Sequence, residues 1–299
     1  MAIAVSKLKA SPILMTVAAI SSIQMGSAVA KGLLQTVDPI VVTLMRVGFS
    51  AIAFHPVWWP QYRQYTRQQY VTAAIFGLSI AGTNFFFYQA ISRIPLGLAV
   101  TLEFLGPLGV AIAHSRRAID VLWVLLAAAG IVGLAPIGGF ELDPVGMGFA
   151  LVAGGCWAGY VLCAERAGKV LPPGQGVTLA LVFSTLAILG LSAGDRLLQQ
   201  DSISTGFTLT PHAVLLGLLV AMLSSGLPLV LEVAALKRLP VRIFGVLLSL
   251  EPAIAAGIGA VFLNETLTAR VLGAISLVVL ASAGASSVRP KAETPPTDA

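Results

Sequence analysis

Five charged side chains stand inside stretches of sequence that are otherwise apolar, and they are the first candidates for chemistry. They are Lys31, Arg46, Glu103, Glu232 and Glu251. A charge at the centre of a membrane-spanning helix costs about 2.5–3.5 kcal/mol to insert, so each needs a partner or a function. Arg46 and Glu251 lie deepest, and each fits either an ion pair between helices or a contact to a ligand. Lys31 stands near the end of its stretch, where its ammonium group is expected to reach the membrane surface.

Prolines interrupt two of the apolar stretches at matching places. Pro252 follows Glu251, and Pro107 follows Gly106. Proline removes a backbone donor and clashes with the preceding turn, so each helix should break here and leave carbonyl groups unpaired at mid-depth. A third break is predicted at Pro228. A single proline is often only a packing kink, but paired breaks in two halves of a chain are typical of a transporter site.

Polar and aromatic side chains on several stretches can line a cavity together with these charges. Hydroxyls and amides can hydrogen-bond an ammonium or a carboxylate group, and aromatic faces accept apolar or cationic groups. The predicted cavity residues are Gln24, Ser27, Arg46, Asn84, Tyr88, Glu103, Trp157, Tyr160, Ser225 and Glu251. Gly155 and Gly159 form a GxxxG spacing, which is more often a sign of close helix packing than of a site.

Motifs for catalysis and for nucleotide hydrolysis are missing from the sequence. There is no HExxH and no GxxxxGK[ST], and neither cysteine has a histidine near it in sequence. An ATP-driven pump in one chain is excluded, and no metal, cofactor or nucleic acid is expected to bind. An intramembrane enzyme is the weakest alternative, because it needs a nucleophile and a base that converge in the bundle.

The composition shows which elements must position these residues. The chain has 299 residues, of which 57% are hydrophobic and 10% charged, and the mean hydropathy is +0.91. An average soluble domain carries about 25% charged residues, so the excess apolar sequence must face lipid. We therefore predict an all-α polytopic membrane protein with ten spanning helices. The predicted spans are 12–31, 38–57, 70–92, 95–114, 118–137, 145–165, 175–193, 211–235, 239–262 and 266–286.

The cations between the spans predict the orientation. Thirteen of the eighteen lysines and arginines fall on the side of the N-terminus and four on the other side, while Arg46 lies within a span. Because cytoplasmic loops carry the excess of cations, both termini are predicted to be cytoplasmic.

An internal repeat is predicted at an offset of 145 residues. Ala90-Ile91-Ser92-Arg93-Ile94-Pro95 resembles Ala235-Leu236-Lys237-Arg238-Leu239-Pro240, and the match continues from Pro107 to Pro252. Five helices is an odd number, so the second copy would enter the membrane from the opposite side, as in many secondary transporters. The predicted units are an N-terminal segment at 1–11, repeats at 12–137 and 145–286, a connecting loop at 138–144 and a disordered tail at 287–299.

Four segments carry a resemblance to a known family. They are SIQMGSAVAKGL (22–33), IPLGLAVTLEFLGPL (94–108), GGCWAGYVL (154–162) and RLPVRIFGVLLSLEPAIAAGIGAVFLNETLT (238–268). They resemble the EamA-type exporters of the drug/metabolite transporter superfamily, above all the threonine/homoserine exporter branch. The related exporters of aromatic amino acids match these motifs less well.

This resemblance implies an amino-acid exporter of the bacterial inner membrane with a central cavity, working by alternating access. An amino acid is a zwitterion, so glutamates together with Arg46, hydroxyls and helix ends could hold its two charges. Other metabolites or drugs are the alternative substrates. Proton exchange and facilitated export both stay open, and one chain of ten helices is expected to work as a monomer.

Overall fold

The described part of the chain is helical throughout. The computed structural model describes residues 11–113, 119–134, 143–172, 174–198, 210–236 and 238–287. The predicted segment 1–11, loop 138–144 and tail 287–299 fall almost entirely outside these residues. The helices are α2 (Pro12–Leu33), α3 (Pro39–Phe54), η1 (Tyr62–Gln64), α4 (Arg67–Ile91), α5 (Leu96–Glu103), α6 (Leu105–Ala113), α7 (Ile119–Leu134), α8 (Pro144–Val170), α9 (Gln175–Leu198), α10 (Pro211–Ala221), the π-helical η2 (Met222–Gly226), α11 (Leu227–Leu236), α12 (Val241–Leu248), α13 (Glu251–Phe262) and α14 (Ala269–Ser287).

Several helices begin with a capping residue followed by proline. The side chain of Asp38 accepts the N–H of Ile40 at the start of α3, and Thr210 caps α10 in the same way. Proline at the first helical position loses no hydrogen bond, and its fixed φ suits the helix. Local sequence therefore sets where these helices start.

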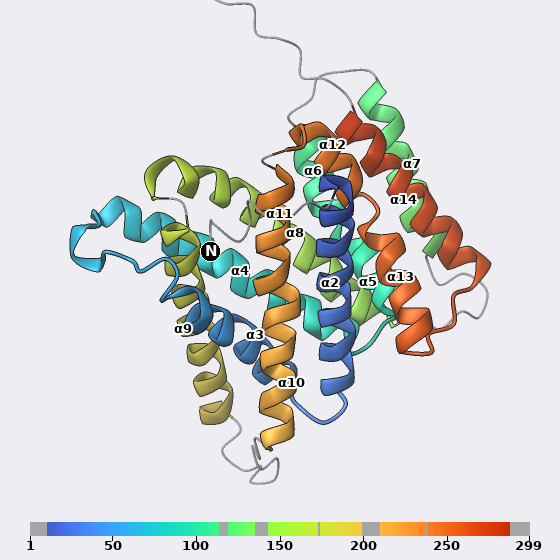
Figure 1. Cartoon of the computed structure of the whole chain (residues 1–299). Helices are drawn as coiled ribbons and strands as arrows, with labels where there is room; N and C mark the ends of the chain where they lie inside the picture. The colour runs from blue at the N-terminus through green and yellow to red at the C-terminus, as the bar shows by residue number, and fades with distance from the viewer. Residues whose placement is uncertain are drawn as a thin grey trace, which may run out of the picture.

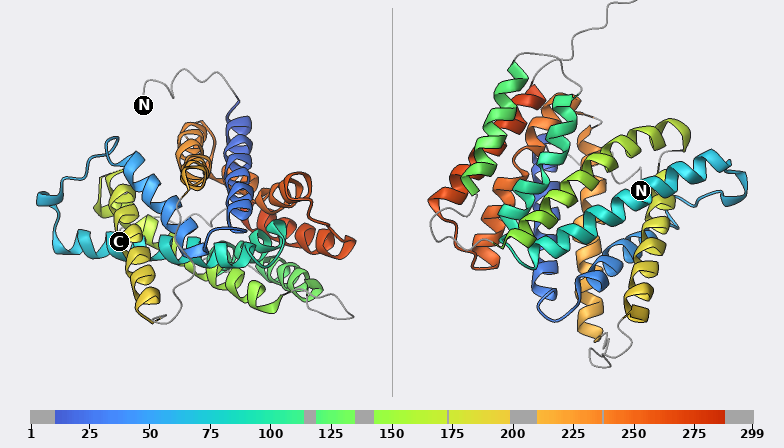
Figure 2. Two further views of the ribbon diagram at one scale, coloured as in Figure 1. Left: turned by 90° about the horizontal axis from the view of Figure 1, so that it is seen from below. Right: turned by 180° about the vertical axis from the view of Figure 1, so that it is seen from behind.

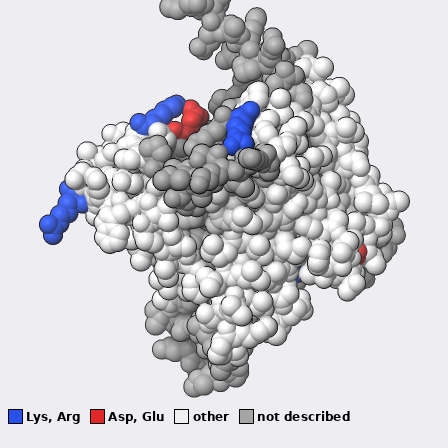
Figure 3. Space-filling view, viewed as in Figure 1, with Lys and Arg blue, Asp and Glu red and all other residues white. Residues whose placement is uncertain are grey.

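Within the described residues, six helical segments are long and apolar enough to cross a membrane. Four shorter apolar helices coincide with the remaining predicted spans, at Pro39–Phe54, Leu96–Val110, Val121–Gly130 and Ala269–Gly284. The face seen in Figure 3 is mostly uncharged, with its few described charged side chains near the margins. The prediction of an all-α polytopic membrane protein is confirmed, and the count of ten spans and the position of the termini stay predictions.

Two predicted spans each consist of two helices joined by a turn. Helix α5 ends at Glu103 and α6 begins at Leu105, while α12 ends at Leu248 and α13 begins at Glu251. Both breaks lie just before the prolines singled out above. When 145 is added to the residue numbers at the two ends of α5, the result is the two ends of α12. At the third predicted break, the chain forms the π-helix η2 directly before Leu227 and Pro228.

Glycines allow the helices of the centre to approach closely. A Cβ atom at Gly106 would overlap the carbonyl oxygen of Gly154 in α8, and one at Gly97 would lie 2.6 Å from the Cα of Ala256 in α13. Gly155 faces open space instead, so the close contact of α8 uses the neighbouring glycine rather than the GxxxG pair. Helix α2 packs against α10, α11 and α13 (Figures 1 and 2). Helix α2 therefore packs against two of the three broken helices, the one that includes η2 and the one made of α12 and α13.

Candidate functional site

The centre of the bundle holds a hydrogen-bonded pair of polar side chains. The Nε2 of Gln24 on α2 donates to the Oε1 of Glu251 at a distance of 2.8 Å. Gln24 is 1% exposed and Glu251 is 8% exposed, and the Oε1 of Gln24 has no hydrogen-bond partner. A buried polar atom without a partner is costly, so this oxygen is free to accept from a bound ligand.

A second set of charged groups surrounds this pair. Arg46 on α3 donates from Nη1 to the hydroxyl of Tyr88 at 3.3 Å, and its guanidinium lies 5.7 Å from the centre of that ring. Glu103, at the C-terminal end of α5, is 8% exposed, and its charge interacts with the charges of Glu251 and Arg46. Among the described residues, Arg46 forms no ion pair within 4.0 Å. Two buried carboxylates and the half-buried guanidinium of Arg46 are thus near enough for their charges to interact.

Aromatic residues and a third glutamate extend this region. Glu232 on α11 interacts electrostatically with both Glu251 and Tyr160. Tyr160 packs on Phe76 with ring centres 5.2 Å apart, and Trp157 meets the ring of Phe104 edge-on at 5.1 Å. Phe104 is the turn residue between α5 and α6, so Trp157 lies against that helix break.

The remaining predicted cavity residues make only local contacts. The hydroxyl of Ser27 donates to the carbonyl of Ile23, and the amide of Asn84 donates to that of Ile80, both one turn earlier in the same helix. Ser225 is half-buried, whereas Ser224 beside it is 6% exposed with an unpartnered hydroxyl. The structure therefore places Ser27 and Ser224 in the interior, without direct bonds to the central charges.

An ion pair that sequence reasoning missed lies at one end of α2. The Nζ of Lys31 is 2.6 Å from the Oε1 of Glu265 and donates to the carbonyl of Ile94 at 2.7 Å. The expectation that Lys31 merely reaches the membrane surface is therefore wrong, because its charge is paired inside the protein. Glu265 gives no signal in the sequence, because it lies in the polar link between two spans, which resembles an ordinary loop.

A second, more exposed ion pair lies at the same end. Arg93 is 3.2 Å from Asp143, which caps the start of α8. The pKa of Asp143 lies below its ordinary value. Desolvation raises this pKa, but the hydrogen bonds and the positive charge around the carboxylate lower it by more. The hydrogen bonds come from Arg93, which also supplies the charge, and from the N–H groups of Val145 and Gly146.

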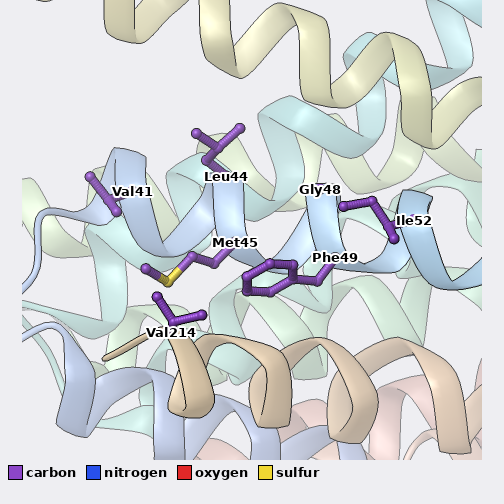
Figure 4. Close-up of a pocket in the computed structure, with 7 residues that line it drawn as sticks. All are labelled: Val41, Leu44, Met45, Gly48, Phe49, Ile52 and Val214. Carbon is purple, nitrogen blue, oxygen red and sulfur yellow. The ribbon is translucent and has the colours of Figure 1, made fainter. Parts of the chain in front are cut away.

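An apolar pocket lies apart from the charged centre. It has a volume of about 220 Å³ and is formed by α3 and α10, with Met45 and Phe49 facing Val214 (Figure 4). Ile52, which also lines it, is 69% exposed. None of the predicted cavity residues lines this pocket. We conclude that it is a groove on the apolar outer surface and not the charged site.

No metal centre is present in the described ranges. They contain no group of three or more histidine, cysteine, aspartate or glutamate side chains that could hold a metal ion. The glutamates of the centre are arranged with Arg46 and Tyr88, which can neutralise and hydrogen-bond charged groups. The arrangement suits the reversible binding of a small charged molecule.

A helical membrane bundle with a buried charged site at two matched helix breaks defines a membrane transport protein. The model of the EamA-like transporter family matches residues 144–287. The threonine/homoserine exporters RhtA of Salmonella typhimurium (strain SL1344) and Escherichia coli (strain K12) are 40% and 39% identical over 278 residues, which are 92% of this chain and 91% of each relative. A solved crystal structure shares the fold with a TM-score of 0.57 and 20% identity, over 91% of this chain and 94% of that chain. The chain belongs to the EamA-like transporter family, and it is a transporter rather than an enzyme.

Proposed function

We propose that this protein exports amino acids of the threonine and homoserine type across the bacterial inner membrane. Two relatives that match over nearly their whole length are named threonine/homoserine exporters. The observation that carries the proposal is the central juxtaposition of Glu103 and Glu251 with Arg46, whose guanidinium has no ion pair in the described part of the chain. The α-ammonium and α-carboxylate of an amino acid are complementary to such a set.

The binding mode follows from the positions of these groups. The substrate carboxylate binds Arg46, which can offer a bidentate contact. The ammonium group binds between Glu103 and Glu251, and the free Oε1 of Gln24 accepts a further hydrogen bond from it. Tyr88, which is fully buried, holds the guanidinium in place through its hydroxyl.

Competition of a proton and the substrate ammonium for the same carboxylates also supports an exchange of substrate for protons. Two buried carboxylates beside one guanidinium leave an uncompensated negative charge, which is costly in a low-dielectric site. In the absence of substrate, a proton on one of the glutamates removes this charge. The ammonium group of the substrate binds the same two carboxylates, so the proton must leave when the substrate binds, while the substrate carboxylate pairs with Arg46. We therefore propose proton antiport, with Glu232 as the next carboxylate toward the predicted cytoplasmic side.

The architecture that we propose is one of two inverted five-helix repeats, 12–137 and 145–286, with both termini in the cytoplasm. The family match at 144–287 and the shared position of the breaks before Pro107 and Pro252 support this arrangement. Relative motion of the halves would expose the centre alternately to each side, with Gly106, Pro107, Pro228 and Pro252 as the predicted hinge residues. One chain is sufficient to enclose the pathway, so we propose a monomer.

A wider range of amino acids is the second candidate, and the aromatic side chains favour it. Tyr88, Trp157 and Tyr160 can accept apolar as well as polar substrate side chains.

The test is uptake of labelled threonine into proteoliposomes, with and without a pH gradient, in the presence of unlabelled homoserine, phenylalanine, methionine, lysine or glutamate. Competition by homoserine alone supports a narrow exporter, and competition by several types supports a broad one. Stimulation by the gradient supports antiport. Uptake no greater than in empty liposomes would contradict the proposed function.

A further inference from the structure

The ion pair of Lys31 and Glu265 joins parts of the chain that lie far apart in sequence. Lys31 stands in the last turn of α2, while Glu265 follows α13. Both oxygens of the Glu265 carboxylate also accept the backbone N–H of Leu96, the first residue of α5, at 3.1 and 2.9 Å. One carboxylate thus holds α2 and α5 of the first predicted repeat to a segment of the second.

The backbone around Glu265 is shaped to bring its carboxylate to this position. Asn264 has a φ of 53°, a left-handed conformation that asparagine tolerates better than most residues. This turns the chain directly before Glu265. A Cβ at position 259 would overlap the carboxylate, so glycine at this position leaves room for Glu265 to reach Leu96 and Lys31. The ion pair is therefore a built feature of the fold and not a chance contact of two flexible side chains.

The pair lines a depression at the end of the bundle. A cavity of about 630 Å³ lies over it and includes Ser92, Arg93 and Asn264 together with Lys31 and Glu265. On the other side of the pair, α2 continues through Ser27 to Gln24, which are both 1% exposed. Lys31 and Glu265 themselves are only 16% and 9% exposed at their side chains. The distribution of cations predicts that this end faces the outer side of the membrane.

We propose that the Lys31–Glu265 ion pair is the outer gate of the transport pathway, closed in this structure and broken each time the protein releases substrate to the outside. The inference rests on the proposed function, because a gate needs a transported molecule. If the two predicted halves move apart at this end, this contact opens, because its partners belong to different halves. Its loss should then favour the outward-open state.

The experiment measures access to Ser27 from outside. Cys156 and Cys163 are replaced by serine, Ser27 by cysteine, and the protein is treated in right-side-out vesicles with a maleimide that does not cross membranes. Glu265→Gln removes the charge but keeps an oxygen for Leu96, and Lys31→Met removes the other charge. A hydrogen bond between charged groups that exists only in the closed state favours that state over the outward-open state by about tenfold to a hundredfold. We expect alkylation to be faster by that factor in both variants.

Asp143→Asn is the matched control. It breaks the neighbouring ion pair with Arg93 but keeps a residue that caps α8 well, and it should leave alkylation unchanged. Unchanged alkylation in both gate variants would overturn the proposal, as would rapid alkylation in the protein with the intact pair. The readout does not depend on which molecule is transported, so absence of threonine uptake would refute the proposed function without deciding the gate.

Discussion

The substitution Glu251→Gln tests the proposed binding site most directly. Glutamine has nearly the same volume, and its amide oxygen can still accept the hydrogen bond from Gln24 that now measures 2.8 Å. The change removes only the negative charge from a position that is 8% exposed. Folding should therefore be retained, because no cavity forms and no donor loses its partner.

The expected loss of transport follows from the strength of one buried contact. A hydrogen bond to a charged group contributes about 1.5–3 kcal/mol, against about 0.5–1.5 kcal/mol for a neutral one. Replacing the carboxylate that faces the substrate ammonium leaves a neutral contact, a loss of about 1–1.5 kcal/mol, and should thus raise the half-saturating threonine concentration by about fivefold to tenfold. The assay is uptake into proteoliposomes at equal protein content, with monodispersity in detergent as the check on folding.

The control for this experiment is Glu165→Gln. Glu165 pairs with Lys169 one turn away on α8, and its side chain is 65% exposed, so its loss should leave uptake unchanged. Full transport by folded Glu251→Gln protein, with an unchanged half-saturating concentration, would refute the assignment of Glu251 to the substrate ammonium.

Three further predictions concern the same centre. Arg46→Gln should raise the half-saturating threonine concentration by about tenfold to a hundredfold, and an unchanged value in the uptake assay would remove Arg46 from the carboxylate site. Glu103→Gln should abolish the stimulation of uptake by a pH gradient if this carboxylate carries the exchanged proton, whereas full stimulation would leave that role to another group. Gly106→Ala should lower stability by about 1–3 kcal/mol because its methyl group would overlap α8, measured by thermal denaturation in detergent. Gly155→Ala, which meets open space, should have no such effect, and equal effects of the two changes would contradict the packing argument.

Much of the fold could be predicted because the signals for it are local. A membrane span is recognised from about 20 consecutive apolar residues, and each predicted span coincides with helix in the described residues. The breaks before Pro107 and Pro252 could be predicted because proline acts on its own preceding turn. The family resemblance rested on contiguous motifs as well, and the comparisons confirm it.

The sequence by itself therefore determined the class of protein, the positions of the helices and the residues whose charge had to be accounted for. Tertiary structure alone decided which of these residues meet. The contact of Gln24 with Glu251 joins residues 227 positions apart, and that of Lys31 with Glu265 joins residues 234 apart. Whether Gly154 or Gly155 faces a neighbouring helix likewise depends on how α8 is rotated in the bundle. Hydropathy shows that a helix lies in the membrane, but its rotation and its neighbours are set by packing with helices from distant parts of the chain.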